Sequence, residues 1–224
     1  MNSLKNKNKT CAVIPILNEE KFIFNVVSNT LKYVDKVIVV NDGSSDNSVN
    51  TINHFDNVEI INHQSNLGKG KALYSGFQKV INDKYDYVLT LDGDLQHDPE
   101  CLPSFINALE TFDIVIGNRL NNLKSMPIQR IASNKITSFL ISVKSGKKIL
   151  DSQSGYRGFR VDNLNKYLPS KSGYEAESEM LLKAAKLNLS FGFVDIPTIY
   201  GNEKSKMNPF ITTFNFIRLI LSRI

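Results

Sequence analysis

Short, continuous runs of apolar, mostly β-branched residues alternate with helical patterns along the first half of the chain, and this alternation constrains the fold most. Five runs predict strands, at Cys11–Ile16, Lys36–Asp42, Val58–Asn62, Tyr87–Asp92 and Asp113–Asn118. Continuous apolar runs are typical of strands buried on both faces. The patterns between them predict helices at Glu19–Tyr33, Asn47–His54, Lys69–Asn82 and Pro99–Thr111. This order predicts an α/β fold with a mostly parallel central sheet flanked by helices.

The pattern changes after Asn118. We expect a helix at Pro127–Val143, a strand at Gly155–Arg160, a helix at Glu175–Leu187 and a last strand at Phe191–Ile196. The final residues form an amphipathic helix with one apolar face, made of Phe210, Phe214, Ile217, Leu221 and Ile224. Such a helix either lies on a membrane surface or docks on its own domain. The chain therefore divides into a basic, disordered N-terminus (1–10), one domain (11–208) and an amphipathic helix (209–224).

Composition excludes several classes of protein. With 224 residues, 42% of them hydrophobic, the chain can bury a substantial core, so intrinsic disorder is excluded. Two cysteines, Cys11 and Cys101, do not make a disulfide framework, and we expect them to be reduced in a cytoplasmic protein. No run of 18 apolar residues predicts a membrane span, and the polar, lysine-rich start does not resemble a signal peptide.

The positive charge is concentrated in one stretch. The net charge is +5, yet residues 114–150 contain no Asp or Glu and carry seven basic residues: Arg119, Lys124, Arg130, Lys135, Lys144, Lys147 and Lys148. This block is either a solvated surface or a contact for an anionic partner such as a phosphate or an anionic membrane. Nucleic acid is disfavoured, because Phe139 is the only aromatic residue of the stretch that could stack on bases.

Carboxylates follow three of the predicted strands. Glu19 follows the first, Asp42 ends the second, and Asp92 and Asp94 come at the end of the fourth. Since ligands of open parallel sheets bind beyond the carboxyl ends of the strands, these acids should share one site. The Asp92-Gly93-Asp94 motif can present hard oxygen ligands to Mg2+ or Mn2+ and leave positions open for a diphosphate.

Two nearby motifs leave alternatives open. His97 is either a metal ligand or a packing residue, and the three histidines lack the spacing of a zinc site. The segment NLGKGKA places Lys69 at a helix start, where it either contacts phosphates or lies in solvent. The segment lacks the GxxxxGK[ST] pattern, which disfavours a P-loop NTPase.

Six segments in a fixed order resemble a known family: VIPILNEE, VVNDGSSDNS, NLGKGKA, LDGDLQHDP, SQSGYRGFR and YGNEKSKMNP. Together they resemble the family-two glycosyltransferases of the GT-A fold, in the dolichyl-phosphate mannose synthase-like (polyprenyl-phosphate glycosyltransferase) branch. The resemblance extends from Cys11 to Pro209 and implies a Rossmann-like sheet with a C-terminal amphipathic helix. It implies an inverting, metal-dependent enzyme that moves a sugar from a nucleotide-diphosphate sugar to a polyprenyl phosphate.

The same resemblance implies roles for particular residues. Nucleotide-sugar binding would fall to Pro15, Glu19, Asp42, Lys69, Asp92, Arg157, Lys204 and Lys206. The metal, Mg2+ or Mn2+, would be held by Asp92, Asp94 and Gln96. The residues closest to the reaction would be Asp94, Arg119, Arg130 and Glu179, with Arg119 and Arg130 binding phosphates. Arginine suits these sites because its planar guanidinium pairs bidentately with phosphate oxygens.

Two other functions compete with this one. An enzyme with a hydroxyl acceptor would need a general base, for which Glu179 and Glu175 are the candidates. A phosphate acceptor is already ionised and would leave Glu179 an orienting role. A non-catalytic nucleotide-sugar-binding scaffold could share the fold. The preferred reading predicts a cytoplasmic protein that is peripheral on the inner face of the membrane. A separate membrane-anchoring subunit is a possible partner.

Overall fold

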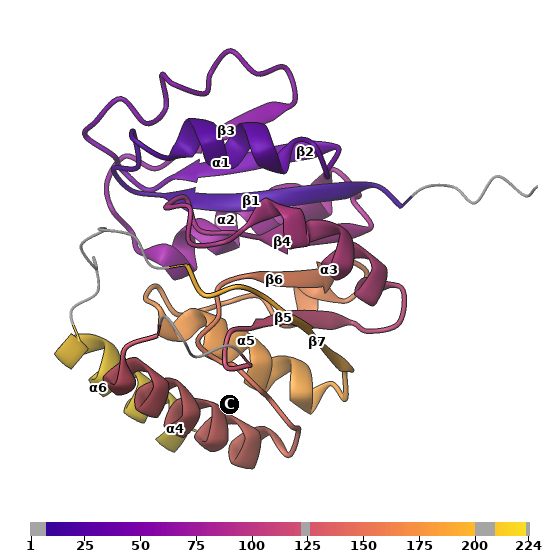
Figure 1. Ribbon diagram of the computed structural model, residues 1–224, viewed down its shortest axis with the longest axis vertical. Coiled ribbons are helices and arrows are strands. Elements are labelled where there is room, and N and C mark those ends of the chain that lie inside the picture. The colour runs from indigo at the N-terminus through magenta and orange to yellow at the C-terminus, as the bar shows by residue number, and fades with distance from the viewer. Residues whose placement is uncertain (1–7, 122–125, 200–208, 223–224) are drawn as a thin grey trace, which may run out of the picture.

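The computed structural model describes residues 8–121, 126–199 and 209–222. Its centre is a seven-stranded sheet with the order β3-β2-β1-β4-β6-β5-β7 (Figure 1). The strands are β1 Thr10–Ile16, β2 Lys36–Asn41, β3 Val58–Asn62, β4 Tyr87–Thr90, β5 Ile114–Asn118, β6 Arg157–Arg160 and β7 Phe191–Asp195. These bounds agree with the continuous apolar runs of the sequence.

All strand pairs are parallel except those of β6, which runs antiparallel to both β4 and β5. The mostly parallel sheet predicted from the sequence is therefore confirmed. In the β4–β6 pair, Thr90 lies opposite Arg157. The loop that leads into β6 consequently reaches the same edge of the sheet at which β1, β2 and β4 end.

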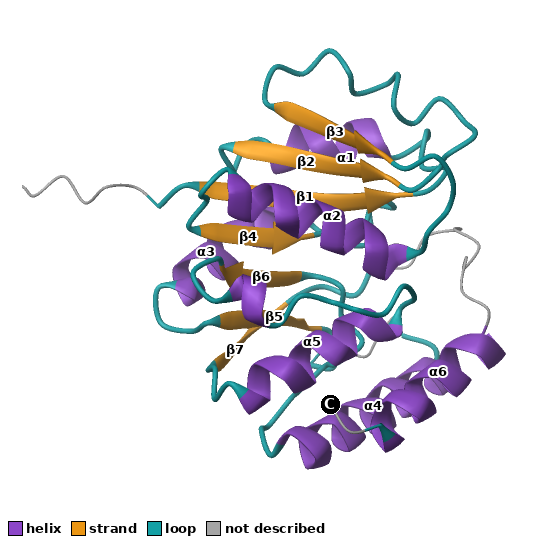
Figure 2. Ribbon diagram, turned by 180° about the vertical axis from the view of Figure 1, so that it is seen from behind, coloured by secondary structure: helices purple, strands orange, loops and turns teal. Residues whose placement is uncertain are grey.

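Helices cover both faces of the sheet (Figures 1 and 2). One face carries α1 (Ile23–Thr30) and α3 (Leu102–Leu109), which follows the 3-10 helix η1 (Pro99–Cys101). The other face carries α2 (Lys69–Asn82) and α5 (Glu175–Lys186). Against α5 pack α4 (Ile128–Ser145) and α6 (Pro209–Leu221), and a second 3-10 helix, η2, spans Leu164–Lys166.

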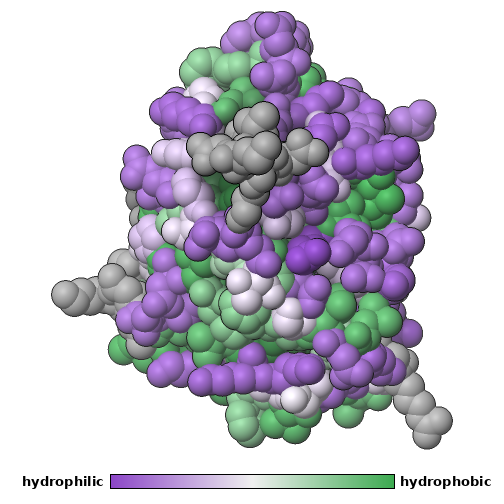
Figure 3. Space-filling model, turned by 90° about the vertical axis from the view of Figure 1, so that its right-hand side faces the viewer, coloured by the Kyte–Doolittle hydropathy of each residue, from purple (hydrophilic) through white to green (hydrophobic). Residues whose placement is uncertain are grey.

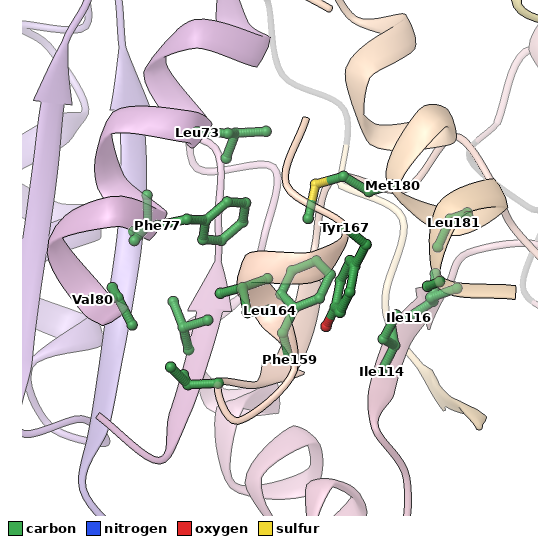
Figure 4. Packing of buried hydrophobic residues seen from close by; sticks show 14 of the residues in the cluster. Leu73, Phe77, Val80, Ile114, Ile116, Phe159, Leu164, Tyr167, Met180 and Leu181 are labelled. Atoms are coloured by element: carbon green, nitrogen blue, oxygen red, sulfur yellow. The ribbon is translucent and has the colours of Figure 1, made fainter. Parts of the chain in front are cut away.

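Each face has its own hydrophobic cluster. On the α2 and α5 side, Phe77 of α2 meets Phe159 of β6 edge to face, with ring centroids 5.4 Å apart (Figure 4). Met180 and Leu181 extend this cluster along α5. Fully burying one such side chain contributes about 1.5–3 kcal/mol, so the cluster fixes α2 and α5 firmly on the sheet.

Two expectations about local structure differ from the structure. The predicted helix at Asn47–His54 is a series of turns. Asp46 accepts hydrogen bonds from the Ser48 N–H (3.0 Å) and hydroxyl (2.5 Å), and the Ser48 hydroxyl accepts one from the Glu19 N–H (2.8 Å). Side chains that bond the backbone in this way compete with helix formation. Thr10, expected to belong to the N-terminal segment 1–10, is instead the first residue of β1, and its N–H donates to Asp35 at 2.7 Å.

The C-terminal helix is present and docks on its own domain. Phe216 and Leu219 are buried, and the Lys144 ammonium of α4 donates to the carbonyls of Ile220 (2.5 Å) and Ser222 (2.6 Å). A cation at these last carbonyls also complements the dipole of α6. Within the ranges described, no helix has the length and apolar character needed to cross a bilayer.

Candidate active site

A cleft of about 890 Å³ opens where β1, β2 and β4 end. Its volume is in the range typical of small-ligand sites. Eight residues singled out in the sequence line it: Pro15, Glu19, Asp42, Lys69, Asp92, Asp94, Gln96 and Arg130. The structure thus brings together side chains from three strand ends, the start of α2 and the first turn of α4.

Asp42 ties the end of β2 to the loop before α2. Its buried carboxylate accepts hydrogen bonds from the backbone N–H groups of Leu67 (2.9 Å) and Gly68 (2.8 Å). The His63 ring nitrogen Nδ1 lies 2.7 Å from the same carboxylate, and His63 Nε2 lies 2.9 Å from the Ser75 hydroxyl. Asp42 therefore shapes the wall of the cleft, and its contact with a nucleoside stays a prediction.

Two glycines place Lys69 at the cleft. Gly68 has φ of +96°, and a Cβ at Gly70 would lie 2.2 Å from the Lys171 carbonyl oxygen. The Gly70 N–H donates to the Ser172 carbonyl at 2.7 Å, so the loop before α5 packs directly on the first turn of α2. A side chain at either glycine would push the loop before α5 away from the start of α2.

Lys69 bridges two carboxylates at this position. Its ammonium lies 2.7 Å from Asp92 Oδ1 and 3.2 Å from Glu177 Oε2. Burial lowers the pKa of Lys69, but the two carboxylates outweigh burial and raise the pKa above its ordinary value. The same ion pair outweighs burial at Asp92 and lowers its pKa. At neutral pH Lys69 and Asp92 are therefore both charged.

Asp94 has the opposite electrostatic environment. Burial, together with the negative charge of Asp92, raises the pKa of Asp94 to about 6. The Gln96 N–H donates to Asp94 at 3.1 Å, and Gly93 lets the turn approach β1, since a Cβ there would lie 2.9 Å from Ile16 Cγ2. A cation bound nearby would stabilise the ionised carboxylate of Asp94.

The residues at this turn fit a divalent metal ion. Asp92, Asp94 and Gln96 offer the hard oxygen donors that Mg2+ and Mn2+ prefer. Across the described parts of the chain, no group of three or more His, Cys, Asp and Glu side chains forms a preassembled metal site. A metal bound by two carboxylates and an amide would keep coordination positions for substrate oxygens.

His97 supports the turn at Asp92 through a backbone hydrogen bond. The ring is buried and stacks on Tyr156 at 5.0 Å, and its Nδ1 accepts a hydrogen bond from the Asp92 N–H at 3.0 Å. Burial lowers the pKa of His97 to about 4, so the ring is neutral at neutral pH. Of the two alternatives that the sequence leaves open, the structure supports packing and positioning.

Arg157 does not face the cleft. Its side chain is 1% exposed, and its guanidinium donates to the carbonyls of Ser152 (2.9 Å), Ser154 (2.8 Å) and Glu177 (2.6 Å). This differs from the expectation that Arg157 binds the diphosphate of the nucleotide sugar. The guanidinium instead holds the loop before β6 against α5.

Arg119 and Glu179 also lie outside the cleft lining. Arg119 pairs bidentately with the buried Asp151, at 2.8 Å and 3.0 Å. Glu179 accepts hydrogen bonds from the N–H groups of Ser170 (2.8 Å) and Lys171 (3.0 Å), and also from the Ser170 hydroxyl. Glu179 thus orients the loop that covers the start of α2. Lys204 and Lys206 lie outside the described residues.

Sequence reasoning missed Glu177, which pairs with Lys69 at the cleft, whereas Glu179 lies outside it. Both acids stand in the segment YEAESEM. Residues two apart on a helix point in nearly opposite directions, so only one of them can face the cleft. The lining residues Gln153, Gly173 and Tyr174 were missed as well.

The mostly parallel α/β sheet, with acidic side chains gathered beyond the ends of β1, β2 and β4, has the arrangement of the GT-A fold. The model of the family "Glycosyl transferase family 2" matches residues 11–168, so the chain belongs to glycosyltransferase family 2 and is an enzyme of the transferase class.

Named relatives and solved structures agree with this family. The chain is 34% identical to the UDP-N-acetylglucosamine–dolichyl-phosphate N-acetylglucosaminyltransferase of Methanococcus voltae, over 84% of each chain. It is 26% identical to the undecaprenyl-phosphate mannosyltransferase of Micrococcus luteus, over 86% of this chain and 83% of that one. Glucosyl-3-phosphoglycerate synthase of Mycobacterium tuberculosis in complex with UDP has a similar fold (TM-score 0.76, 21% identity), covering 96% of this chain and 79% of that one.

Proposed function

We propose that this chain is a metal-dependent, inverting glycosyltransferase that moves a sugar from a nucleotide-diphosphate sugar to a polyprenyl phosphate. One observation carries the proposal. The cleft that holds Asp92 and Asp94 is also lined by Arg130, and Arg130 stands on a helix whose outer face is apolar. A donor site and a site for a lipid phosphate would therefore share one cleft.

On the donor side, Asp92, Asp94 and Gln96 would hold Mg2+ or Mn2+. The bound metal would supply a Lewis acid that stabilises negative charge on the departing nucleoside diphosphate. Pro15, Glu19 and Asp42 line the part of the cleft beyond β1 and β2, where we place the nucleoside. Glucosyl-3-phosphoglycerate synthase of Mycobacterium tuberculosis, which shares the fold, has been solved with Mn2+ and UDP.

On the acceptor side, Arg130 would bind the phosphate. An oxygen of this phosphate attacks the anomeric carbon as the bond to the diphosphate breaks, which inverts the configuration in a single displacement. The attacking oxygen is already ionised at neutral pH, so no proton has to be removed. Glu179 is occupied by Ser170 and Lys171 outside the cleft, which is consistent with a reaction that needs no base there.

The surface beside the cleft suits a membrane. Helices α4 and α6 pack side by side and expose large apolar side chains, among them Ile128 (82% exposed), Phe139 (66%), Phe214 (66%) and Leu221 (80%). The lower end of the molecule, where both helices lie, shows hydrophobic side chains beneath a belt of hydrophilic ones (Figure 3). Helix α4 also belongs to the acid-free stretch 114–150, which would attract anionic lipids.

We therefore place the enzyme on the inner face of the membrane as a peripheral protein, with or without a separate anchoring subunit. The relatives support this placement, because their names specify dolichyl phosphate or undecaprenyl phosphate as the acceptor.

The test uses purified protein, Mg2+ or Mn2+, a panel of radiolabelled nucleotide sugars, and added polyprenyl phosphate. We expect label to enter the organic phase as an acid-labile product. Donor hydrolysis without lipid labelling would favour a hydroxyl acceptor, and donor binding without turnover would favour a scaffold. Arg130→Ala should reduce lipid labelling more than Glu179→Gln does, and the reverse order would contradict the phosphate acceptor.

A further inference from the structure

Three charged side chains from three separate elements meet at one point of the cleft. They are Lys69 at the start of α2, Asp92 after β4, and Glu177 in the first turn of α5. The Lys69 ammonium lies between the two acids, 2.7 Å from Asp92 and 3.2 Å from Glu177. All three are largely or partly shielded from solvent, so their interactions are stronger than those of surface ion pairs.

The surrounding backbone is fitted to this cluster. A Cβ at Gly155 would lie 2.9 Å from Lys69 Nζ, 3.1 Å from Asp92 Oδ2 and 3.2 Å from Glu177 Oε1, so a side chain there would displace the Lys69 ammonium. The Gly155 carbonyl accepts a hydrogen bond from the Thr90 hydroxyl at 2.9 Å, and Arg157 holds the Glu177 carbonyl at 2.6 Å. The loop before β6 and the first turn of α5 are thereby fixed around Lys69.

In this arrangement Lys69 competes with a metal ion for Asp92. An ammonium at 2.7 Å already uses Asp92 Oδ1, and a divalent cation on the same carboxylate would repel it. Glu177 already offers Lys69 a second carboxylate, 3.2 Å from the ammonium. The ammonium can therefore leave Asp92 without becoming an unpaired charge in a shielded site, which would be costly.

We propose that Lys69 is a built-in counter-ion of Asp92. When a divalent cation binds Asp92, the Lys69 ammonium leaves Asp92 and pairs with Glu177 alone. The inference rests on the proposed metal dependence and assigns a positioning function to Lys69 and Glu177. In the absence of donor, Lys69 opposes metal binding. Its charge stays at the start of α2, where a diphosphate would be favoured, so metal and donor bind better together than metal alone.

The first test measures Mn2+ binding to the full chain without nucleotide, from the electron paramagnetic resonance signal of free Mn2+. Lys69→Met should bind Mn2+ about tenfold more tightly than the wild type, because the competing charge is gone. Lys71→Met is the matched control. Lys71 lies two residues further along α2 with its ammonium over the Tyr74 ring, and its removal should change the affinity less than twofold. Equal or weaker Mn2+ binding by Lys69→Met would overturn the proposal.

A second measurement follows the Lys69 ammonium directly. The side-chain ammonium resonance of Lys69, assigned by its absence in Lys69→Met or Lys69→Arg, should shift when diamagnetic Mg2+ is added. In Glu177→Gln the ammonium lacks its second carboxylate, so Mg2+ affinity should fall. A Lys69 resonance that does not move at saturating Mg2+ would contradict the exchange of partners.

Neither measurement uses a sugar donor or a lipid acceptor, so the inference can fail separately from the proposed function. Metal-dependent transfer to lipid with no effect of Lys69→Met on Mn2+ binding would keep the function and remove the role of Lys69. Tighter Mn2+ binding by Lys69→Met, in a protein whose wild type transfers no sugar, would keep the role of Lys69 and remove the proposed function.

Discussion

The guanidinium of Arg157 donates a hydrogen bond to the backbone carbonyl of Glu177 at 2.6 Å, joining the first residue of β6 to the first turn of α5. Its other donors are taken by the carbonyls of Ser152 and Ser154. This buried cation bonds three carbonyls and so holds the loop before β6 against α5.

Arg157→Ala should therefore lower the free energy of unfolding by about 3 kcal/mol or more, because three buried carbonyls would lose charged donors. Urea unfolding followed by circular dichroism measures this change. We expect Arg157→Lys to fall between wild type and alanine, since a lysine cannot reach three acceptors in one plane. Full stability combined with a loss of donor affinity would restore the original expectation that Arg157 contacts the diphosphate.

The metal hypothesis predicts a large effect at Asp94. Asp94→Asn keeps the shape of the turn and removes a charged oxygen ligand, so transfer should fall about 100-fold or more. Chelation of the metal should reduce wild-type transfer to the same level, and added Mg2+ or Mn2+ should restore it. Asp162→Asn, which removes only an exposed partner of Arg160 outside the cleft, is the matched control and should keep full activity. An Asp94→Asn enzyme as active as this control would exclude a metal role for Asp94.

Glu179 should matter for stability more than for chemistry. Burial raises the pKa of Glu179, but the hydrogen bonds from Ser170 and Lys171 outweigh burial and lower it below its ordinary value of 4.5. A lowered pKa in the folded state means that the carboxylate stabilises the fold above pH 4.5 and loses this contribution as the pH falls through the lowered value.

Glu179→Gln should consequently cost about 2 kcal/mol of unfolding free energy at pH 7. The difference from wild type should shrink as the pH is lowered below 4.5. Denaturant unfolding over a pH series checks both statements. A variant that is equally stable at every pH but transfers no sugar would point to a general base and a hydroxyl acceptor.

The proposed membrane face gives a fourth prediction. Phe139 of α4 and Phe214 of α6 are both exposed, so Phe139→Asp and Phe214→Asp should leave the fold intact. Each should weaken binding to vesicles that contain an anionic phospholipid by about tenfold. The substitution removes an aromatic side chain that would insert into the bilayer, and it adds a negative charge that anionic lipids repel. Vesicle flotation measures the bound fraction. Phe24→Asp, at an exposed phenylalanine of α1 on the opposite face of the sheet, should bind like wild type, and equal weakening by all three would contradict this face.

The sequence was sufficient for the sheet, because continuous apolar runs such as Lys36–Asn41 have few alternatives to a buried strand. It was also sufficient for the acidic edge, since Asp42 and Asp92 follow strands that end on one side. It failed at Asn47–His54, where the Asp46 and Ser48 side chains replaced helical hydrogen bonds with local ones.

The antiparallel insertion of β6 explains why Arg157 lies elsewhere than the sequence led us to expect. The pairing of β6 between β4 and β5 turns Arg157 into the protein, and no local pattern encodes this pairing. Likewise, the face that α5 presents to the cleft is decided by packing against α2 and α4. For that reason Glu177, and not Glu179, reaches Lys69.

The measurement that tests the central claim most directly compares polyprenyl phosphate with the corresponding polyprenol as acceptor, in the same assay with radiolabelled nucleotide sugar. We predict metal-dependent labelling of the phosphate, no labelling of the alcohol, and no labelling of either in the presence of a chelator. Equal labelling of the alcohol, or labelling that persists in the chelator, would contradict transfer to a lipid phosphate by a metal-dependent enzyme.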